Sequence, residues 1–153
     1  MIGINSKAPD FELKGSDGKT HKLSEFKGGY LVLYFYPKDD TPGCTTEACG
    51  FRDMISDIRK AGAEVVGISS DNVDSHGKFR DKYKLNFLLL SDPESKVIKA
   101  FDSYGDRGIF GMGTLRKTFV IDGKGVIVKI FEKVKPEHHN EEVLAFLKSA
   151  KAG

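Results

Sequence analysis

The chain has two cysteines, Cys44 and Cys49, and the residues around Cys44 indicate a reactive thiol. Cys44 lies in the stretch Pro37–Cys49, which follows an apolar run and leads into a helical pattern. A helix N-terminus has unpaired N–H groups and a partial positive charge, and both favour thiolate over thiol. Pro42 and Gly43, directly before Cys44, are typical of a loop and not of a buried core. Cys44 is therefore a candidate nucleophile.

A helix N-terminus alone does not supply enough stabilisation. A free cysteine has a pKa near 8.5, and lowering that pKa by two units takes about 2.7 kcal/mol. A helix end contributes at most about 2 kcal/mol. We therefore expect a second group, and the hydroxyl of Thr41 in the same loop is a suitable donor. The candidate cations are Lys38, Arg52, Arg80, Arg107 and Arg116. Arg116 has the best local argument because it lies at the mouth of a predicted strand, where sites of α/β sheets collect.

Cys49 follows Cys44 by five residues. On a regular helix this spacing gives a rotation of about 140° and a separation of roughly 8–9 Å. A disulfide needs Cα atoms closer than about 7 Å. If the two cysteines bridge, the first turns of the helix must unwind. Gly43 and Gly50 favour such a rearrangement, so we expect a helical reduced form and a locally unfolded oxidised form.

A metal site is the competing use of two thiols. A zinc site usually has four ligands, in pairs only a few residues apart along the sequence. Here the two cysteines have no such partners, because the four histidines are scattered along the chain. We therefore expect no metal and no cofactor. The adjacent His138 and His139 are expected at the solvent-exposed start of the last helix.

The predicted elements place Cys44 after a central strand. Tyr30–Tyr36 is a continuous apolar and aromatic run, as in a strand buried on both faces. The other expected elements are a hairpin around Asp17-Gly18, a helix over Glu47–Ala61, a strand over Glu64–Ser69, a helix over 73–83 capped by Ser70 or Asp71, a strand over Phe87–Leu90, a helix over Ser95–Phe101, a loop over Tyr104–Gly113, a hairpin of Thr118–Asp122 with Val126–Phe131, and a last helix containing Val143 to Leu147. This order predicts an α/β fold with a parallel core, antiparallel strands at the edge and helices on both faces.

Composition narrows the class of protein. With 153 residues, 39% apolar and 30% charged, the chain reads as one globular domain over residues 1–153. The net charge of +2 gives no case for nucleic acid or membrane as a partner. No apolar run reaches the roughly 20 residues needed to span a bilayer, and the N-terminus shows no signal peptide. We expect a cytoplasmic protein, a compartment in which a cysteine pair is more often catalytic than structural.

The stretch Pro37-x-x-x-Thr41-x-x-Cys44 resembles the active-site motif of the peroxiredoxins. The run from Cys44 to Cys49 is similar to the subgroup called Q-type peroxiredoxins or bacterioferritin comigratory proteins. The resemblance covers nearly the whole chain, through Ala8–Phe11, Leu31–Tyr36, Phe51–Asp53, Val66–Ser69, Leu90–Asp92 and Arg116–Asp122. It implies a thioredoxin fold with an N-terminal hairpin, and an antioxidant thiol peroxidase that works without metal or haem.

The resemblance also implies roles for individual residues. Cys44 would be the peroxidatic cysteine, which becomes a sulfenic acid, and Cys49 the resolving cysteine of an intramolecular disulfide. Thr41 and Arg116 would position the peroxide and stabilise the thiolate, helped by backbone N–H groups near Gly43. Pro37 would also belong to the catalytic set, because it shapes the loop together with Pro42. The supporting residues would be Pro42, Gly43 and Glu47, which orients an arginine.

The implied substrates are hydrogen peroxide and organic hydroperoxides, and the implied reductant is a thioredoxin-like protein. The expected assembly is a monomer or weak homodimer. Two other readings use the same cysteines. The protein could be a redox sensor or chaperone that switches through the disulfide, or a dithiol oxidoreductase. The spacing Cys44-x-x-x-x-Cys49 disfavours the oxidoreductase, which would use C-x-x-C.

Overall fold

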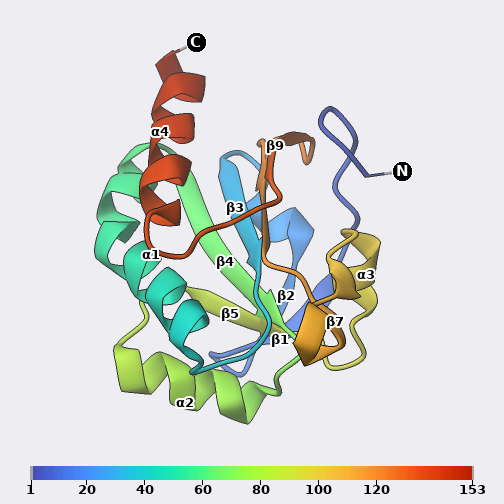
Figure 1. The fold of residues 1–153 in the computed structure, drawn as a ribbon. Helices are drawn as coiled ribbons and strands as arrows, with labels where there is room; N and C mark the ends of the chain where they lie inside the picture. The colour runs from blue at the N-terminus through green and yellow to red at the C-terminus, as the bar shows by residue number, and fades with distance from the viewer. Residues whose placement is uncertain (1, 153) are drawn as a thin grey trace.

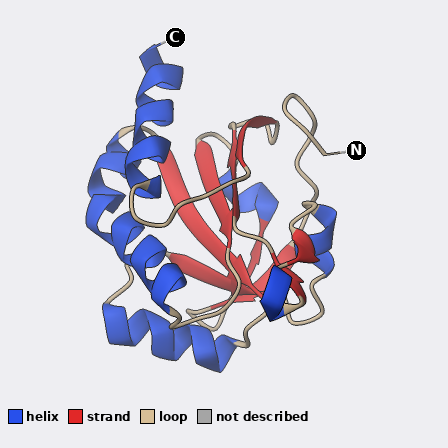
Figure 2. Cartoon of the chain, in the orientation of Figure 1, coloured by secondary structure: helices blue, strands red, loops and turns tan. Residues whose placement is uncertain are grey.

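The structure is a computed structural model that describes residues 2–152. Its centre is a seven-stranded sheet of order β2-β1-β5-β4-β3-β8-β9 (Figure 1). The strands of this sheet are β1 (Glu12–Gly15), β2 (Thr20–Lys22), β3 (Tyr30–Phe35), β4 (Ala63–Ser69), β5 (Leu88–Ser91), β8 (Lys117–Ile121) and β9 (Ile127–Phe131). The α-helices are α1 (Pro42–Lys60), α2 (Val73–Tyr83), α3 (Lys96–Ala100) and α4 (His139–Ala152), and η1 (Leu23–Phe26) is a short 3₁₀ helix. Figure 2 shows the helices wrapped around the strands.

The parallel core of the sheet is formed by β3, β4 and β5, as predicted. Successive residues of β3 alternate between two apolar clusters, so the strand is buried on both faces. Helices α1, α2 and α4 cover one face, whereas α3, η1 and the N-terminal segment cover the other (Figure 1). The continuous apolar run over 30–36 follows from this double burial.

Antiparallel hairpins close both edges of this core. The hairpin β1–β2 pairs with β5, and the hairpin β8–β9 pairs with β3. Because β8 runs against β3, the beginning of β8 lies beside the end of β3, with Lys117 opposite Phe35. This register brings residues near 116 to the point where the chain leaves β3 for α1.

Three local expectations were wrong. The helix expected from Glu47 begins at Pro42, because proline is tolerated at the first helical position, where no N–H is needed. The cap of α2 is Asn72, whose side chain accepts a hydrogen bond from the Ser75 N–H, and not Ser70 or Asp71. The expected loop over 104–113 contains a small separate hairpin, β6 (Tyr104–Asp106) with β7 (Met112–Thr114), around the 3₁₀ turn η2 (Gly108–Phe110).

No helix among residues 2–152 combines the length and apolar character needed to cross a membrane.

Candidate active site

Cys44 lies in the first turn of α1, beyond the carboxyl end of β3. The helix begins at Pro42, with Thr41 as its extended N-cap residue. Cys44 is therefore in the first turn of a 19-residue helix, where backbone N–H groups lack partners within the helix. Cys44 is only 1% exposed, and it is a free thiol. Burial and a helix N-terminus together give the environment that the sequence predicted for a nucleophile.

Arg116 is the cation that the structure brings to Cys44, although 72 residues separate them. Its Nη2 donates a hydrogen bond to Cys44 Sγ at 3.4 Å, and its Nη1 donates to Glu47 Oε1 at 2.8 Å. The register of β8 against β3 explains the encounter. Gly43 permits it, because a Cβ at that position would lie 3.1 Å from Arg116 Nη2. A larger residue at 43 would push the guanidinium away from the sulfur.

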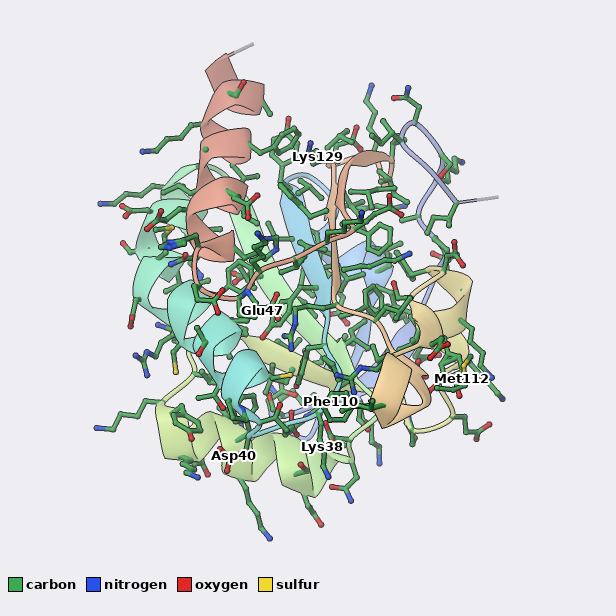
Figure 3. All side chains as sticks on the ribbon, viewed as in Figure 1. Lys38, Asp40, Glu47, Phe110, Met112 and Lys129 are labelled. Carbon is green, nitrogen blue, oxygen red and sulfur yellow. The ribbon has the colours of Figure 1, made fainter. Side chains whose placement is uncertain are left out.

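The Arg116 and Glu47 charges influence one another strongly because both groups are shielded from water. Burial lowers the pKa of Arg116, but Cys44 and Glu47 outweigh this and raise it above the ordinary arginine value. Burial raises the pKa of Glu47 to about 7, against the opposing charge of Arg116. Glu47 points inward beneath α1 (Figure 3), and its Oε2 has no hydrogen-bond partner. The pair thus holds the positive charge of Arg116 at 3.4 Å from the Cys44 sulfur.

The other predicted loop residues surround the same turn. The Thr41 hydroxyl donates to the carbonyl of Lys38 at 2.9 Å, so its hydrogen is used within the loop while its oxygen can still accept. Pro37 directly follows the buried Tyr36 and begins the loop. The other candidate arginines make contacts elsewhere: Arg52 with the Tyr83 carbonyl, Arg80 with the Ser16 carbonyl, and Arg107 over the ring of Phe110.

Cys49 occupies the next turn of α1 and is a free, partly buried thiol. Burial raises its pKa; Arg52 acts against this and Asp53 adds to it. Because α1 is helical through both cysteines, the spacing of a regular helix keeps their sulfurs from bridging. The structure therefore matches the helical reduced form that the sequence predicted.

The start of α4 holds functional candidates that the sequence did not reveal. His138 is exposed, but His139 is fully buried, so the expectation of two solvent-exposed histidines was wrong for His139. Its ring packs edge-on against Phe51 and Phe131, and its Nε2 lies 2.7 Å from the Thr118 hydroxyl. Burial lowers the pKa of His139 to about 4, with a further contribution from the charge of Arg116. A buried neutral histidine gives no signal in local sequence patterns.

The adjacent Asn140 contacts α1 itself. Its side-chain amide donates to the carbonyl of Gly50 at 3.0 Å. A Cβ at Gly50 would lie 3.2 Å from the Asn140 side chain, so the glycine admits this close contact. The contact lies one residue beyond Cys49, at the end of the segment that would unwind to form a disulfide.

A second polar group lies behind the loop before Cys44. Oxygen and nitrogen atoms of Asp39, Asp71 and His76 lie within 4.8 Å of one another, a spacing that could hold a cation. Both ring nitrogens of His76 already have hydrogen-bond partners, so we read this group as an internal network. Neither cysteine belongs to it. A groove of about 670 Å³, lined by residues such as Ala8, Leu31 and Ile121, lies at the other end of β3, away from Cys44.

Comparisons with known proteins agree with this geometry. Residues 4–130 match the model of the AhpC/TSA family. The chain is 51% identical over 150 residues to peroxiredoxin Bcp of Bacillus subtilis, covering 96% of both chains. A cysteine-to-serine mutant of Xylella fastidiosa peroxiredoxin Q superposes with a TM-score of 0.94 at 35% identity, covering 98% of both chains. The bacterioferritin comigratory protein of Xanthomonas campestris superposes with a TM-score of 0.87 at 38% identity, covering 92% of both chains.

The superposition of these solved peroxiredoxins on more than nine tenths of the chain confirms the thioredoxin fold. The match of sequence and structure over most of the chain also confirms the expected class of enzyme. The chain belongs to the AhpC/TSA family and, within it, to the Bcp or Q-type peroxiredoxins.

Proposed function

We propose that this protein is a thiol peroxidase that reduces hydrogen peroxide and organic hydroperoxides through Cys44 in antioxidant defence and redox homeostasis. The contact between Arg116 Nη2 and Cys44 Sγ at the N-terminus of α1 is the observation that carries the proposal. A small peroxide fits this site better than a large substrate, because Cys44 is almost fully buried. The Xanthomonas campestris relative is described as reducing alkyl peroxides, which supports the organic part of this substrate range.

The first step uses the groups around Cys44. The Cys44 thiolate attacks the terminal, hydrogen-bearing oxygen of the peroxide. An S–O bond forms and the O–O bond breaks. The leaving oxygen takes up a proton and departs as water or an alcohol, and Cys44 becomes a sulfenic acid. Arg116 and the N–H groups near Gly43 are the donors available to the charge that develops on oxygen. The Thr41 oxygen can accept a hydrogen bond from the peroxide and so position it.

The second step requires α1 to open. The Cys49 thiol attacks the sulfenic sulfur, the S–S bond forms, and the hydroxyl leaves as water with the Cys49 proton. A dithiol reductant then restores both thiols by thiol–disulfide exchange, supplying two electrons and two protons. We assign this role to a thioredoxin-like protein in the cytoplasm, where a free cysteine pair stays reduced. Pro37 and Pro42 shape the loop that re-forms after reduction. In this proposal the protein acts as a monomer or weak homodimer.

Single substitutions of the two cysteines test the proposal. We expect Cys44→Ser to consume no peroxide, and Cys49→Ser to consume one equivalent without turnover. Steady-state activity in Cys44→Ser would overturn the assignment. Intact mass of the wild type after one equivalent of peroxide, under non-reducing conditions, should show a monomer that has lost two hydrogens. A covalent dimer would contradict the intramolecular disulfide.

Addition of thioredoxin and its reductase separates the enzyme from a redox sensor. A peroxidase should turn over many equivalents of peroxide under these conditions. A disulfide that forms but is not recycled would favour the sensor.

A further inference from the structure

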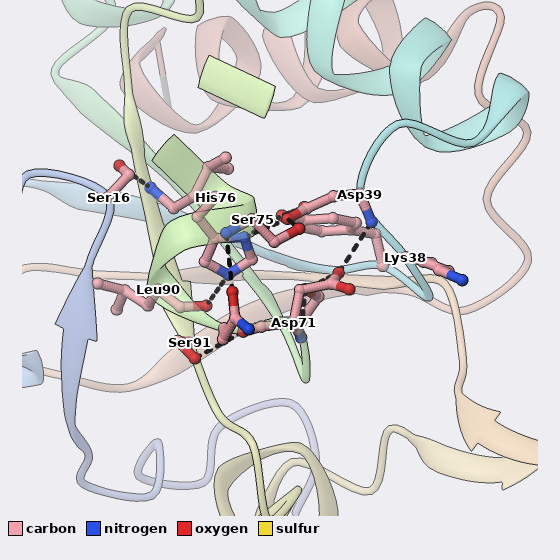
Figure 4. A network of polar contacts seen from close by, with 12 residues as sticks. Ser16, Lys38, Asp39, Asp71, Ser75, His76, Leu90 and Ser91 are labelled. Carbon is pink, nitrogen blue, oxygen red and sulfur yellow. Dashed lines mark hydrogen bonds and ion pairs between the residues drawn. The ribbon is translucent and has the colours of Figure 1, made fainter. Parts of the chain in front are cut away.

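A closed polar network lies behind the loop Pro37–Thr41, which we call the peroxidatic loop because it leads into Cys44 (Figure 4). Its centre is His76, a fully buried side chain in the first turns of α2. His76 Nε2 lies 2.9 Å from the carbonyl oxygen of Leu90, and Nδ1 lies 2.7 Å from Asp39 Oδ2. Since a carbonyl can only accept, Nε2 carries a proton. The contact with Asp39 then needs a second proton between Nδ1 and the carboxylate.

Asp39, the middle residue of the peroxidatic loop, is held through both its side chain and its backbone. Its carboxylate accepts hydrogen bonds from the hydroxyls of Tyr36 at 2.6 Å and Ser75 at 2.8 Å, in addition to the His76 contact. Its backbone N–H donates to Asp71 Oδ2 at 2.8 Å. A carboxylate that is 8% exposed needs such donors, because an unpaired buried charge is costly. The network therefore fixes one position for the middle of the loop.

A second attachment on the solvent side is weaker. Asp40, which adopts a left-handed backbone with φ of 58°, accepts from Lys82 Nζ and from the Tyr83 hydroxyl, each at 2.7 Å. Exposed ion pairs of this kind contribute little. The buried contacts of His76 and Ser75 with Asp39 are thus stronger attachments of α2 to the loop than the exposed contacts with Asp40.

We propose that His76 is a positioning residue for the peroxidase reaction, acting through Asp39. Asp39 is two residues before Thr41, which caps α1, and five before Cys44. A shift of Asp39 therefore moves the Thr41 oxygen and the N–H groups of the first helical turn relative to the sulfur. This inference rests on the proposed function, because it assigns His76 a role in the reaction of Cys44 with peroxide.

Loss of the His76 contact has two effects of opposite sign. The loop and the first turn of α1 are held less firmly in the folded arrangement, so the attack of Cys44 on peroxide slows. The same loosening favours the unwound state in which Cys49 reaches the sulfenic acid. A larger share of Cys44 then forms the disulfide, and a smaller share is oxidised further to the sulfinic acid. General damage to the fold would slow the first reaction without shifting this partition.

Two replacements of His76 separate its two hydrogen bonds. The amide of His76→Asn places a donor near Nδ1, toward Asp39, whereas the amide of His76→Gln places one near Nε2, toward Leu90. We expect His76→Gln to slow Cys44 oxidation by about tenfold and His76→Asn by less than about threefold, as for the loss of one hydrogen bond to a charged group. His21→Gln is the matched control, because His21 bonds Asp17 in the N-terminal hairpin and Glu25 in η1.

The experiment measures the rate of Cys44 oxidation by hydrogen peroxide in stopped flow, and the sulfinic fraction by intact mass at a fixed excess of peroxide. Slower oxidation with a smaller sulfinic fraction in His76→Gln, and wild-type behaviour in His21→Gln, support the proposal. Equal losses in His76→Gln and His76→Asn, or an unchanged sulfinic fraction, overturn it. If His76→Gln does not fold, Ser75→Ala removes another donor to Asp39 and should shift both readouts in the same directions, and unchanged readouts in that variant also overturn the proposal.

The failure of this inference differs from failure of the proposed function. A wild-type protein that does not consume peroxide refutes the function itself. An active wild type with an equally active His76→Gln variant refutes only the positioning role.

Discussion

The first and second turns of α1 each carry a cysteine, but they give it different surroundings. Cys44 is buried and lies within the first helical turn. It contacts Arg116, which follows it by 72 residues. Cys49 is partly exposed, and the arginine nearest to it in sequence, Arg52, bonds the Tyr83 carbonyl. Burial raises the pKa of the Cys49 thiol. These surroundings support the roles proposed above, with Cys44 as the nucleophile toward peroxide and Cys49 as the thiol that attacks the sulfenic acid.

This difference arises from tertiary structure more than from local sequence. Both cysteines belong to the same helix, and both have an acidic residue nearby, Glu47 or Asp53. Arg116, which directly precedes β8, contacts Cys44 and forms an ion pair with the buried Glu47. The position of each cysteine relative to the sheet, and not the residue types beside it, therefore determines which sulfur is hydrogen-bonded to Arg116.

The arginines provide the strongest test of this comparison. Arg116→Met keeps the length of the side chain but removes the positive charge beside Cys44. We expect the rate of Cys44 oxidation by peroxide to fall by roughly 10²–10³-fold, as when a donor to developing charge is removed. Arg52→Met is the control at the other cysteine and should change this rate by less than about twofold. The rates are measured by stopped flow. Similar losses in both variants would show that the charge of Arg116 has no specific effect on Cys44.

The pH dependence of stability is the second test, because it compares two acidic residues of α1. Burial raises the pKa of Glu47 to about 7, so the folded state retains a proton that the unfolded state loses above its ordinary pKa of 4.5. The contribution of this proton to the free energy of unfolding is therefore fully present at low pH and is lost as the pH rises from 4.5 through 7. Between pH 5 and pH 8 the loss amounts to roughly 2–3 kcal/mol.

Glu47→Gln removes this titration, so urea unfolding should show a smaller fall in stability between pH 5 and pH 8 than the wild type shows. Asp53→Asn provides the comparison farther along α1, where the carboxylate is exposed and bonded to Arg52. It should keep the wild-type fall. A wild-type pH dependence in Glu47→Gln would contradict the shifted pKa.

A smaller effect tests whether the first turns of α1 must unwind before the disulfide forms. Alanine in place of a helical glycine stabilises the helix by about 1 kcal/mol, which corresponds to roughly fivefold in an opening equilibrium. At Gly50 the new methyl would crowd Asn140, so the change belongs in the Asn140→Ala background. We expect Gly50→Ala there to slow the formation of the Cys44–Cys49 disulfide by about fivefold, as followed by quenched intact mass.

Gly77→Ala is the control for this substitution. It places the same methyl in α2, where no atom lies within 4 Å of it. The disulfide should form at the wild-type rate in this variant. Equal rates in the Gly77 and Gly50 variants would contradict the need for unwinding.

The sequence predicted the elements with strong periodic patterns. The doubly buried strand at 30–35, the parallel core and the final hairpin all agree with the apolar patterns. The position of Cys44 at a helix N-terminus and the choice of Arg116 also agree, because both depend on features at strand ends.

Other features depend on contacts between distant residues, which periodicity does not contain. The strand order and the register that brings Arg116 to Cys44 are of this kind. So is the burial of His139, since its partners Phe51 and Thr118 lie on other elements. The contact of His76 with Asp39 is also of this kind, because it spans 37 residues.

The place of β8 in the sheet has a consequence for the growing chain. A ribosome adds Cys44 and all of α1 long before it adds Arg116, because this arginine directly precedes β8, the next-to-last strand along the described chain. Until β8 docks against β3, Arg116 is not held beside the Cys44 thiol. Under the proposed mechanism, rapid reaction with peroxide therefore begins only when the sheet is complete, and unfinished or unfolded copies react slowly.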